Sequence, residues 1–239
     1  MQIGLFGYGK MGKAIELTAR AQNIEIAWRI TRENRGNLHP GLLQKADVAI
    51  EFTRPDAAYD NVMACLKAGV PVVCGTTGWL EQLADAENWC VENNGALLWA
   101  SNFSVGVNLF FALNRYLAGR MNAQPNYHPA LTEIHHIHKL DAPSGTALTL
   151  LQDMLALLDR KNNWTLYPTP PGPADIPVTA VREGEVPGTH IVRWNSAADE
   201  IILEHRAHSR EGFAAGALLA AQWLHGKTGV FRMADVLGL

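Results

Sequence analysis

The strongest constraint on the fold lies in the first twelve residues. Residues Gly7–Gly12 form a G-x-G-x-x-G motif that directly follows a candidate strand, Ile3–Phe6, and opens a candidate helix, Met11–Ala21. Glycines at these positions allow a tight turn and a close backbone approach to a pyrophosphate, and the amide groups of a helix N-terminus favour an anion. Because of this placement we expect dinucleotide binding rather than a glycine-rich turn without a ligand.

The first hundred residues alternate short apolar runs with longer mixed segments. The predicted strands are Ile3–Phe6, Glu25–Ile30, Val48–Phe52, Val70–Val73 and Ala96–Ala100. The predicted helices between them are Met11–Ala21, Ala57–Ala68 and Leu80–Asn93. Strands that alternate with helices form a parallel sheet covered on both faces. This part of the chain is therefore predicted to be an α/β, Rossmann-type dinucleotide-binding domain.

The pattern changes after Asn102, and we place a domain boundary near residue 104. The predicted helices are Gly106–Met121, Thr146–Arg160 and Phe213–Leu224. The predicted strands are Ala130–Lys139, Val178–Arg182, His190–Asn195 and Glu200–Ala207, and the proline-rich run Pro168–Pro177 is predicted to be a loop. We expect an α+β domain in which one or two helices pack on a mixed, mostly antiparallel sheet.

Composition excludes several classes of function. Twenty basic and twenty-three acidic residues give a net charge of −3 without a basic block, so we expect no nucleic-acid partner. No apolar run approaches the roughly 20 residues that span a bilayer, and we expect neither a membrane span nor a signal peptide. Cys65, Cys74 and Cys90 are odd in number and lack metal-type spacing, which indicates buried, reduced thiols in the cytoplasm.

The end of the second predicted strand bears on the choice of cofactor. An acidic residue for the adenosine ribose is expected there, but the chain has Thr31 followed by Arg32. Arg32, or Arg29 or Arg35, could meet a 2′-phosphate, so we expect NADPH to be preferred to NADH. The alternative is that these arginines are only exposed residues at a helix entry.

Two loops follow other predicted strands, at the edge where ligands bind in open α/β sheets. The loops are Phe52-Thr53-Arg54-Pro55 and Gly75-Thr76-Thr77-Gly78. Their hydroxyl groups and flexible backbone suit a nicotinamide, although each loop alone could be ordinary turn chemistry.

Residues 133–147 carry the densest set of titratable groups, Glu-Ile-His-His-Ile-His-Lys followed by Leu-Asp-Ala-Pro-Ser-Gly-Thr-Ala. If Ala130–Lys139 is a strand, His135 and Lys139 share one face. A histidine beside a lysine suits protonation of a substrate atom in the pocket of an anionic ligand. The Ser-Gly-Thr run that follows opens a helix, where amide and hydroxyl groups can bind a carboxylate.

Two other interpretations of this segment remain open. A metal site could combine His135, His136 and His138 with His128, His205 or His208, but no carboxylate or cysteine stands in register with them, and we expect no metal. The segment could also be an exposed polar strand edge followed by a helix cap.

Residues Glu133–Ala147 as a whole are similar to the signature of the dihydrodipicolinate reductase family, also called 4-hydroxy-tetrahydrodipicolinate reductases. The resemblance extends to the glycine loop, to Phe-Thr-Arg-Pro at 52–55, to Gly-Thr-Thr-Gly at 75–78, to residues 101–108 and to residues 230–237. It implies an NAD(P)H-dependent oxidoreductase that reduces 4-hydroxy-tetrahydrodipicolinate to tetrahydrodipicolinate in lysine and diaminopimelate biosynthesis. One departure is Thr31, where many members of the family carry an acidic residue.

The resemblance also implies roles for individual residues. His135 would be the general acid and Lys139 a second proton donor. Residues that would bind the substrate dicarboxylate are His136, Ser144, Gly145 and Thr146. The resemblance implies cofactor contacts from Gly7, Tyr8, Gly9, Lys10, Met11, Gly12, Gly75, Thr76, Thr77, Ala100, Ser101, Asn102 and Phe103. The positions at the ends of predicted strands add Thr31, Arg32, Phe52 and Thr53 as expected cofactor contacts.

The resemblance further implies the domain organisation. A dinucleotide-binding domain would comprise residues 1–104 and 211–239, and a substrate-binding and oligomerisation domain would comprise residues 105–210 and assemble a homotetramer. The alternatives to this function are another nicotinamide-dependent dehydrogenase of an amino-acid pathway and a non-catalytic protein that senses NAD(P)H.

Overall fold

The computed structural model describes residues 1–209 and 211–239, which form two compact units. The first unit contains Met1–Val105 and the C-terminal segment from Glu211, and the second contains Gly106–Ser209. The predicted domain boundary at residue 210 lies outside the described residues. The two units are described separately below.

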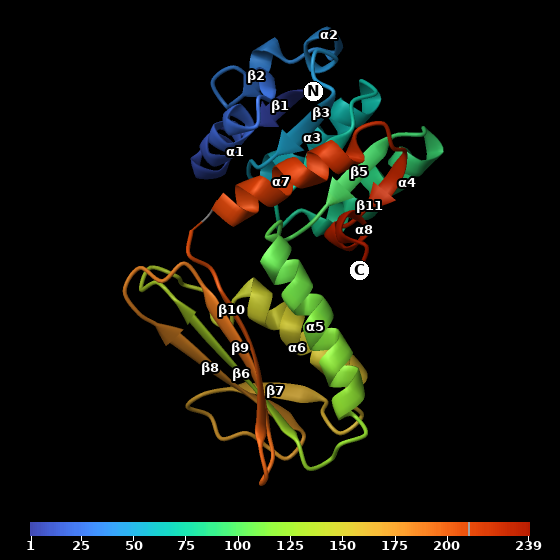
Figure 1. Ribbon diagram of the computed structural model, residues 1–239. Coiled ribbons are helices and arrows are strands. Elements are labelled where there is room, and N and C mark those ends of the chain that lie inside the picture. Colours follow the sequence, from blue (N-terminus) through green and yellow to red (C-terminus); the bar gives the residue numbers. More distant parts are fainter. Residues whose placement is uncertain (210) are drawn as a thin grey trace. The chain divides into compact units, whose positions relative to one another are not determined.

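The first unit is built on a six-stranded parallel sheet with the order β11-β5-β4-β3-β1-β2 (Figure 1). Its strands are β1 (Gln2–Phe6), β2 (Glu25–Ile30), β3 (Val48–Glu51), β4 (Val72–Cys74), β5 (Ala96–Trp99) and β11 (Gly229–Phe231). The chain leaves β1 toward β2 on one side and continues through β3 on the other. The sheet therefore reverses its order between β1 and β3, and ligands bind at such a point in open α/β sheets.

Helices cover both faces of this sheet, as the alternating pattern predicts. One core contains α1 (Lys10–Ala21) and α7 (Glu211–Leu224), and the other contains α3 (Pro55–Lys67) and α4 (Leu83–Glu92). Ile50 belongs to the first core and its neighbour Ala49 to the second, so successive residues of β3 are buried on opposite faces. Burial on both faces explains why the strands are continuous apolar runs.

The α7 helix packs tightly because of a single glycine. A Cβ atom on Gly216 would lie 1.7 Å from the carbonyl oxygen of Phe103, so no larger residue fits without moving the backbone. Residues after Leu224 add β11 to the edge of the sheet beside β5, followed by α8 (Met233–Leu237). The periodicity of the sequence predicted neither of these two short elements.

Within the first hundred residues, some short elements of the structure differ from those predicted from the sequence. The predicted helix at 80–93 is divided into a 3₁₀ turn, η2 (Leu80–Gln82), and α4. Between β2 and β3 lie a second 3₁₀ turn, η1 (Arg35–Asn37), and a short helix, α2 (Pro40–Leu43), that the sequence analysis left unassigned.

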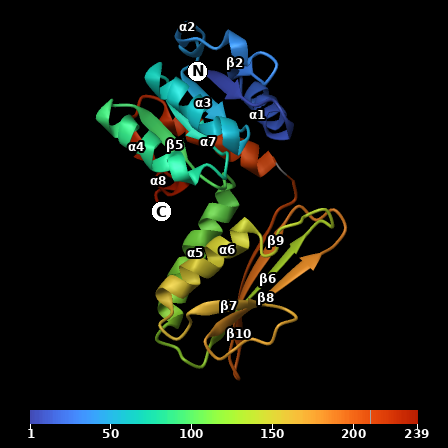
Figure 2. The same cartoon turned by 180° about the vertical axis from the view of Figure 1, so that it is seen from behind.

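The second unit consists of a five-stranded sheet with two helices on one face, visible in Figure 2. The strand order is β10-β9-β6-β8-β7. The strands are β6 (His128–His135), β7 (Asn163–Leu166), β8 (Asp175–Arg182), β9 (Thr189–Asn195) and β10 (Glu200–Arg206). The helices α5 (Val105–Met121) and α6 (Gly145–Leu157) share a core with Leu131, Val178, Val192 and the fully buried Trp194.

The sheet is mixed, but it is not mostly antiparallel. The β10–β9 and β9–β6 pairs are antiparallel, whereas β6–β8 and β8–β7 are parallel. A parallel pair needs a long crossover connection, which α6 supplies between β6 and the β7–β8 pair. The sequence analysis missed β7, and β8 begins at Asp175, inside the run predicted as a loop.

Candidate active site

The glycine loop has the geometry of an anion site. Gly7 has a φ of +86°, and a Cβ there would lie 2.2 Å from the carbonyl oxygen of Phe52. A Cβ on Gly12 would lie 2.2 Å from the Gly7 carbonyl oxygen. A Cβ on Gly9 would meet no atom within 4 Å, so Gly9 faces open space. The α1 helix begins beside Gly9 without a side-chain cap or an acidic first turn, which leaves its N-terminus suited to a pyrophosphate.

Two cavities share this loop at the carboxyl ends of the parallel strands. A cavity of about 550 Å³ is lined by Gly7, Tyr8 and Gly9 together with residues from the ends of β2 and β3. A second cavity, of about 420 Å³, is lined by Gly9, Lys10, Met11, Phe52, Thr53, Gly75, Thr76 and Thr77, among others. The structure thus brings these predicted cofactor residues together around one point of the sheet.

The loops after β3 and β4 are tied to each other. The Thr53 amide donates to Thr76 Oγ1 at 2.9 Å and to Glu51 Oε1 at 3.0 Å. Glu51 is fully buried and also accepts from the Cys74 thiol at 3.1 Å. This carboxylate holds the threonine loops in place, and the sequence analysis did not single it out.

The predicted cofactor residues after β5 divide into two groups. Ala100 and Phe103 are buried, and the Phe103 ring packs edge-on against Phe52 with their centroids 5.5 Å apart. Ser101 is exposed, and the Asn102 side chain accepts a hydrogen bond from the Ser104 amide at 2.8 Å. None of residues 100–103 lines either cavity. Phe103 supports the cofactor loops through Phe52.

The three candidate arginines near the end of β2 have different surroundings. Arg29 pairs with the buried Glu16 at 2.6 and 2.7 Å, which occupies its guanidinium. Arg32 and Arg35 line the larger cavity together with Thr31 and Glu33. The Thr31 hydroxyl donates to Glu33, and this hydrogen bond lowers the pKa of that carboxyl. A carboxylate therefore does lie at the ribose end, two residues later than the sequence motif places it.

The segment that carries His135 and Lys139 departs from the predicted strand. The β6 strand ends at His135, and residues 137–138 form a turn closed by the Lys139 amide donating to the His136 carbonyl at 3.1 Å. The prediction that strand alternation places His135 and Lys139 on one face is therefore wrong. Beyond β6 the Glu183 amide donates to the His135 carbonyl at 2.8 Å and the Ile137 amide donates to the Gly184 carbonyl at 3.1 Å, so the turn stays hydrogen-bonded to the end of β8.

The charge of Lys139 still acts on the pKa of His135. Burial lowers the pKa of His135, the Glu133 carboxylate raises it, and the positive charge of Lys139 lowers it, with a net shift below the ordinary value. Lys139 Nζ donates to Asp141 at 2.9 Å. His136 is half-buried, whereas His138 is exposed and pairs with Glu185 at 3.0 Å. His138 is thus directed to a partner outside this group.

The Ser-Gly-Thr corner starts α6 as predicted. The Ser144 side chain caps the helix by accepting from the Ala147 amide at 3.2 Å. Gly145 is exposed, and a Cβ there would meet no atom within 4 Å. The Ser144 amide donates to Glu133 Oε2 at 3.0 Å, which ties the corner to the same strand as His135. This N-terminus has the geometry expected for carboxylate binding.

Sequence reasoning missed three residues that surround His135, namely Glu133, Arg182 and His190. Glu133 could have been found, because it lies two residues before His135 and shares its face of β6. The statement that no carboxylate stands in register with these histidines is therefore wrong. Arg182 and His190 lie on β8 and β9, and only the strand register brings them to Glu133.

Glu133, His135 and His190 each place one potential ligand atom within 4.8 Å of the others. The group differs from the histidine sets considered from the sequence. However, the Glu133 oxygens already accept from Arg182 at 3.0 Å and from the Ser144 amide. A divalent cation would also face the Arg182 charge at close range. This arrangement favours a hydrogen-bonded cluster over a metal site.

Comparison with known proteins gives the family. The family model described as "Dihydrodipicolinate reductase, N-terminus" matches residues 1–103, and the one described as "Dihydrodipicolinate reductase, C-terminus" matches residues 106–237. The chain belongs to the dihydrodipicolinate reductase family.

Individual members of the family resemble the chain over most of its length. It is 44% identical to 4-hydroxy-tetrahydrodipicolinate reductase of Christiangramia forsetii, covering 99% of this chain and 98% of that protein. It is 34% identical to the enzyme of the same name from Methanoregula boonei, covering 97% and 95%. Dihydrodipicolinate reductase from Paenisporosarcina sp. TG-14, solved with dipicolinate bound, has the same fold with a TM-score of 0.82, 22% identity and 98% of each chain covered.

The structure also bears on the expectation that the chain spans no membrane. Among residues 1–209 and 211–239, no helix has both the length and the apolar character needed to cross a bilayer.

Proposed function

We propose that this protein reduces 4-hydroxy-tetrahydrodipicolinate to tetrahydrodipicolinate with NADPH or NADH, a step of lysine and diaminopimelate biosynthesis. The main support for the proposal is the arrangement of residues 133–147 in the fold. This segment holds a buried histidine at the end of β6, followed along the chain by a lysine and the start of a 13-residue helix. In a member of this family, that arrangement suits proton donation to a bound dicarboxylate.

The cofactor residues fit a nicotinamide dinucleotide. The Gly7–Gly12 loop would hold the pyrophosphate, because Gly9 faces open space and the α1 N-terminus offers amide groups. Gly75, Thr76 and Thr77, with the segment Ala100–Phe103, would surround the nicotinamide. When bound, the reduced nicotinamide supplies the hydride.

NADPH is the proposed preferred cofactor. Arg32 and Arg35 line the larger cavity and could pair with a 2′-phosphate. Arg35 also pairs with the exposed Asp60 at 3.3 Å, whereas the Glu16 ion pair withdraws Arg29. Thr31 offers a hydroxyl at the same point. Glu33 could accept hydrogen bonds from a ribose diol, which explains how NADH would also be accepted.

The substrate would bind through its two carboxylates. Ser144, Gly145 and Thr146 would present amide and hydroxyl groups at the start of α6, and His136 and Lys139 would add positive or donor groups. His135 would act as the general acid, and Lys139 would be a second proton donor. Loss of the 4-hydroxyl group as water would give a conjugated cyclic imine. Hydride addition at C4 of that imine would leave the neighbouring ring carbon carbanion-like, and the proton from the His135 and Lys139 pair would go to that carbon.

The remaining proposals concern location, assembly and domains. We propose a homotetramer formed by the second unit, acting in the cytoplasm on a small-molecule substrate. The net charge of −3 fits a protein without a nucleic-acid partner. The first unit would be the dinucleotide-binding domain and the second the substrate-binding domain.

The test is a coupled assay that follows NADPH absorbance after addition of the product of dihydrodipicolinate synthase, with and without EDTA. Substrate-dependent oxidation that EDTA does not reduce is expected. NADPH binding without such oxidation would indicate a sensing protein instead. Inhibition by EDTA would indicate a metal-dependent reaction.

A further inference from the structure

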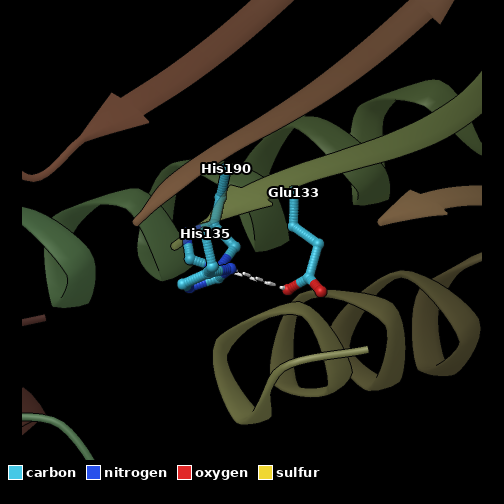
Figure 3. A group of neighbouring side chains, drawn as sticks. All are labelled: Glu133, His135 and His190. Atoms are coloured by element: carbon cyan, nitrogen blue, oxygen red, sulfur yellow. Dashed lines mark ion pairs between the residues drawn. The ribbon is translucent and has the colours of Figure 1, made fainter. Parts of the chain in front are cut away.

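One buried carboxylate contacts both the predicted acid, His135, and the predicted carboxylate-binding corner at Ser144. Glu133 on β6 is fully buried. Its oxygens lie 3.0 Å from the Ser144 amide, 3.0 Å from Arg182 Nη2 and 3.5 Å from His135 Nδ1. Figure 3 shows the His135 ring beside this carboxylate, with His190 next to it. One carboxylate therefore contacts the predicted acid and the predicted carboxylate-binding corner at the same time.

The strand register explains why these residues meet. Glu133 lies opposite His190 in the antiparallel β6–β9 pair, and His135 lies beside Arg182 in the parallel β6–β8 pair. Directly paired residues lie on the same face of a sheet. The register therefore brings polar groups from β8 and β9 to the end of β6. These groups surround the Glu133 carboxylate, which would be strongly unfavourable if it were buried without partners.

The hydrogen bonds keep this carboxylate charged. Burial raises the pKa of Glu133, but the hydrogen bonds from Ser144 and Arg182 outweigh burial and hold that pKa below its ordinary value. Burial lowers the pKa of His190 to about 4, with a smaller contribution from the neighbouring His135. Near neutral pH the cluster thus combines an anionic Glu133 with a neutral His190.

The cluster also restricts how His135 can lie. Its Nδ1 faces Glu133, and the His190 ring packs edge-on against it with centroids 5.1 Å apart and planes at 73°. On the other side, a Cβ on Gly188 would come within 3.1 Å of His135 Nε2, so the glycine leaves room for that nitrogen. A carboxylate beside Nδ1 favours a proton there and directs Nε2 away from Glu133.

The same cluster holds the corner that starts α6. The Ser144 amide donates to Glu133, and the Ser144 hydroxyl lies 3.0 Å from His190 Nε2 while also capping the helix. Displacing Glu133 would therefore loosen both the histidine and the helix N-terminus.

We propose that Glu133 is the positioning residue of this active site, which orients His135 through Nδ1 and fixes the Ser144 corner. Arg182 supports the role by holding the other carboxylate oxygen. The inference rests on the proposed role of His135 as the acid. Glu133 itself touches neither the substrate nor the cofactor in this role.

The test compares Glu133→Gln, Glu133→Asp and a control, Glu200→Gln. Glu200 pairs with Arg193 at 2.9 and 3.0 Å near the surface of β10, away from the cluster. For Glu133→Gln, kcat should fall about 10- to 100-fold with a smaller change in substrate KM. Because the carboxylate raises the pKa of His135, the alkaline limb of kcat/KM should also move to lower pH. Glu133→Asp should recover part of both effects, and Glu200→Gln should stay within twofold of wild type.

An NMR titration of the His135 ring protons provides a readout that does not depend on turnover. The titration midpoint should fall in Glu133→Gln even if the proposed substrate is wrong, so the two proposals fail separately. Unfolding temperature and NADPH affinity show whether each variant is folded. If Glu133→Gln does not fold, Glu133→Asp carries the test and should shift the midpoint in the same direction by less. A folded variant with an unchanged midpoint and pH limb would overturn the inference, even if its kcat were lower.

Discussion

Replacing Gly9 by alanine should weaken NADPH binding while leaving the first unit folded. Gly9 has an extended backbone with a φ of −81°, and an added Cβ would meet no protein atom within 4 Å. The new methyl group would occupy the space that the cavities share beside the α1 N-terminus. It would therefore obstruct the ligand rather than the protein.

The expected magnitude follows from the lost contacts. Keeping a pyrophosphate from one backbone amide removes a charge-assisted hydrogen bond worth about 1.5–3 kcal/mol. NADPH should therefore bind about 10- to 150-fold more weakly. The stability cost should be about 1 kcal/mol, because alanine is a clearly poorer N-cap residue than glycine.

Two further glycines provide the controls. Gly7→Ala should destabilise the unit more than Gly9→Ala, because its φ of +86° costs about 1–2 kcal/mol for an L-residue and its Cβ would lie 2.2 Å from the Phe52 carbonyl. Gly119→Ala, in the exposed part of α5, should leave NADPH affinity unchanged. Fluorescence titration with NADPH and thermal unfolding measure both quantities. A folded Gly9→Ala variant that binds NADPH within twofold of wild type would refute the assignment of the pyrophosphate to this loop.

Three other predictions concern the acid, the cofactor and acid stability. His135→Ala should lower kcat by about 2 to 4 orders of magnitude with little change in NADPH affinity, and turnover within threefold of wild type would remove His135 from the role of acid. Arg32→Ala should raise the KM for NADPH more than the KM for NADH, and an equal effect on both would contradict a 2′-phosphate contact. The Arg29 hydrogen bonds lower the pKa of Glu16 to about 2 from 4.5, so its ion pairs stabilise the fold above about pH 4.5 and this contribution is lost as pH falls toward 2. Urea unfolding at pH 7 and pH 3 should show a smaller pH effect in Glu16→Gln, whereas an unchanged difference would exclude Glu16 as a source of acid sensitivity.

Local patterns predicted the first unit well. Alternating apolar runs indicated β1 to β5 and the helices between them, because burial on both faces of a parallel sheet leaves a continuous apolar run. Short elements such as β11 were not predicted, because three residues are too few to show a periodicity. Family resemblance, not periodicity, indicated that the C-terminal segment returns to this unit.

The candidate site was predicted in part. The sequence indicated His135 and the Ser144 corner, because dense donor groups beside a helix start have a recognisable pattern. Strand alternation gave the wrong position for Lys139, because a turn follows His135. The expected position for an acidic residue also missed Glu33, which lies two residues later and lines the larger cavity.

By itself, the sequence determined the glycine loop, the strand–helix alternation and the segment for which we propose proton donation, because each depends on residues close together in the chain. Only the tertiary structure decided which distant groups complete that segment. Arg182 is 49 positions from Glu133, and His190 is 46 from Ser144. Strand pairing sets such contacts, and it depends on how the whole sheet packs beneath its helices rather than on any local pattern.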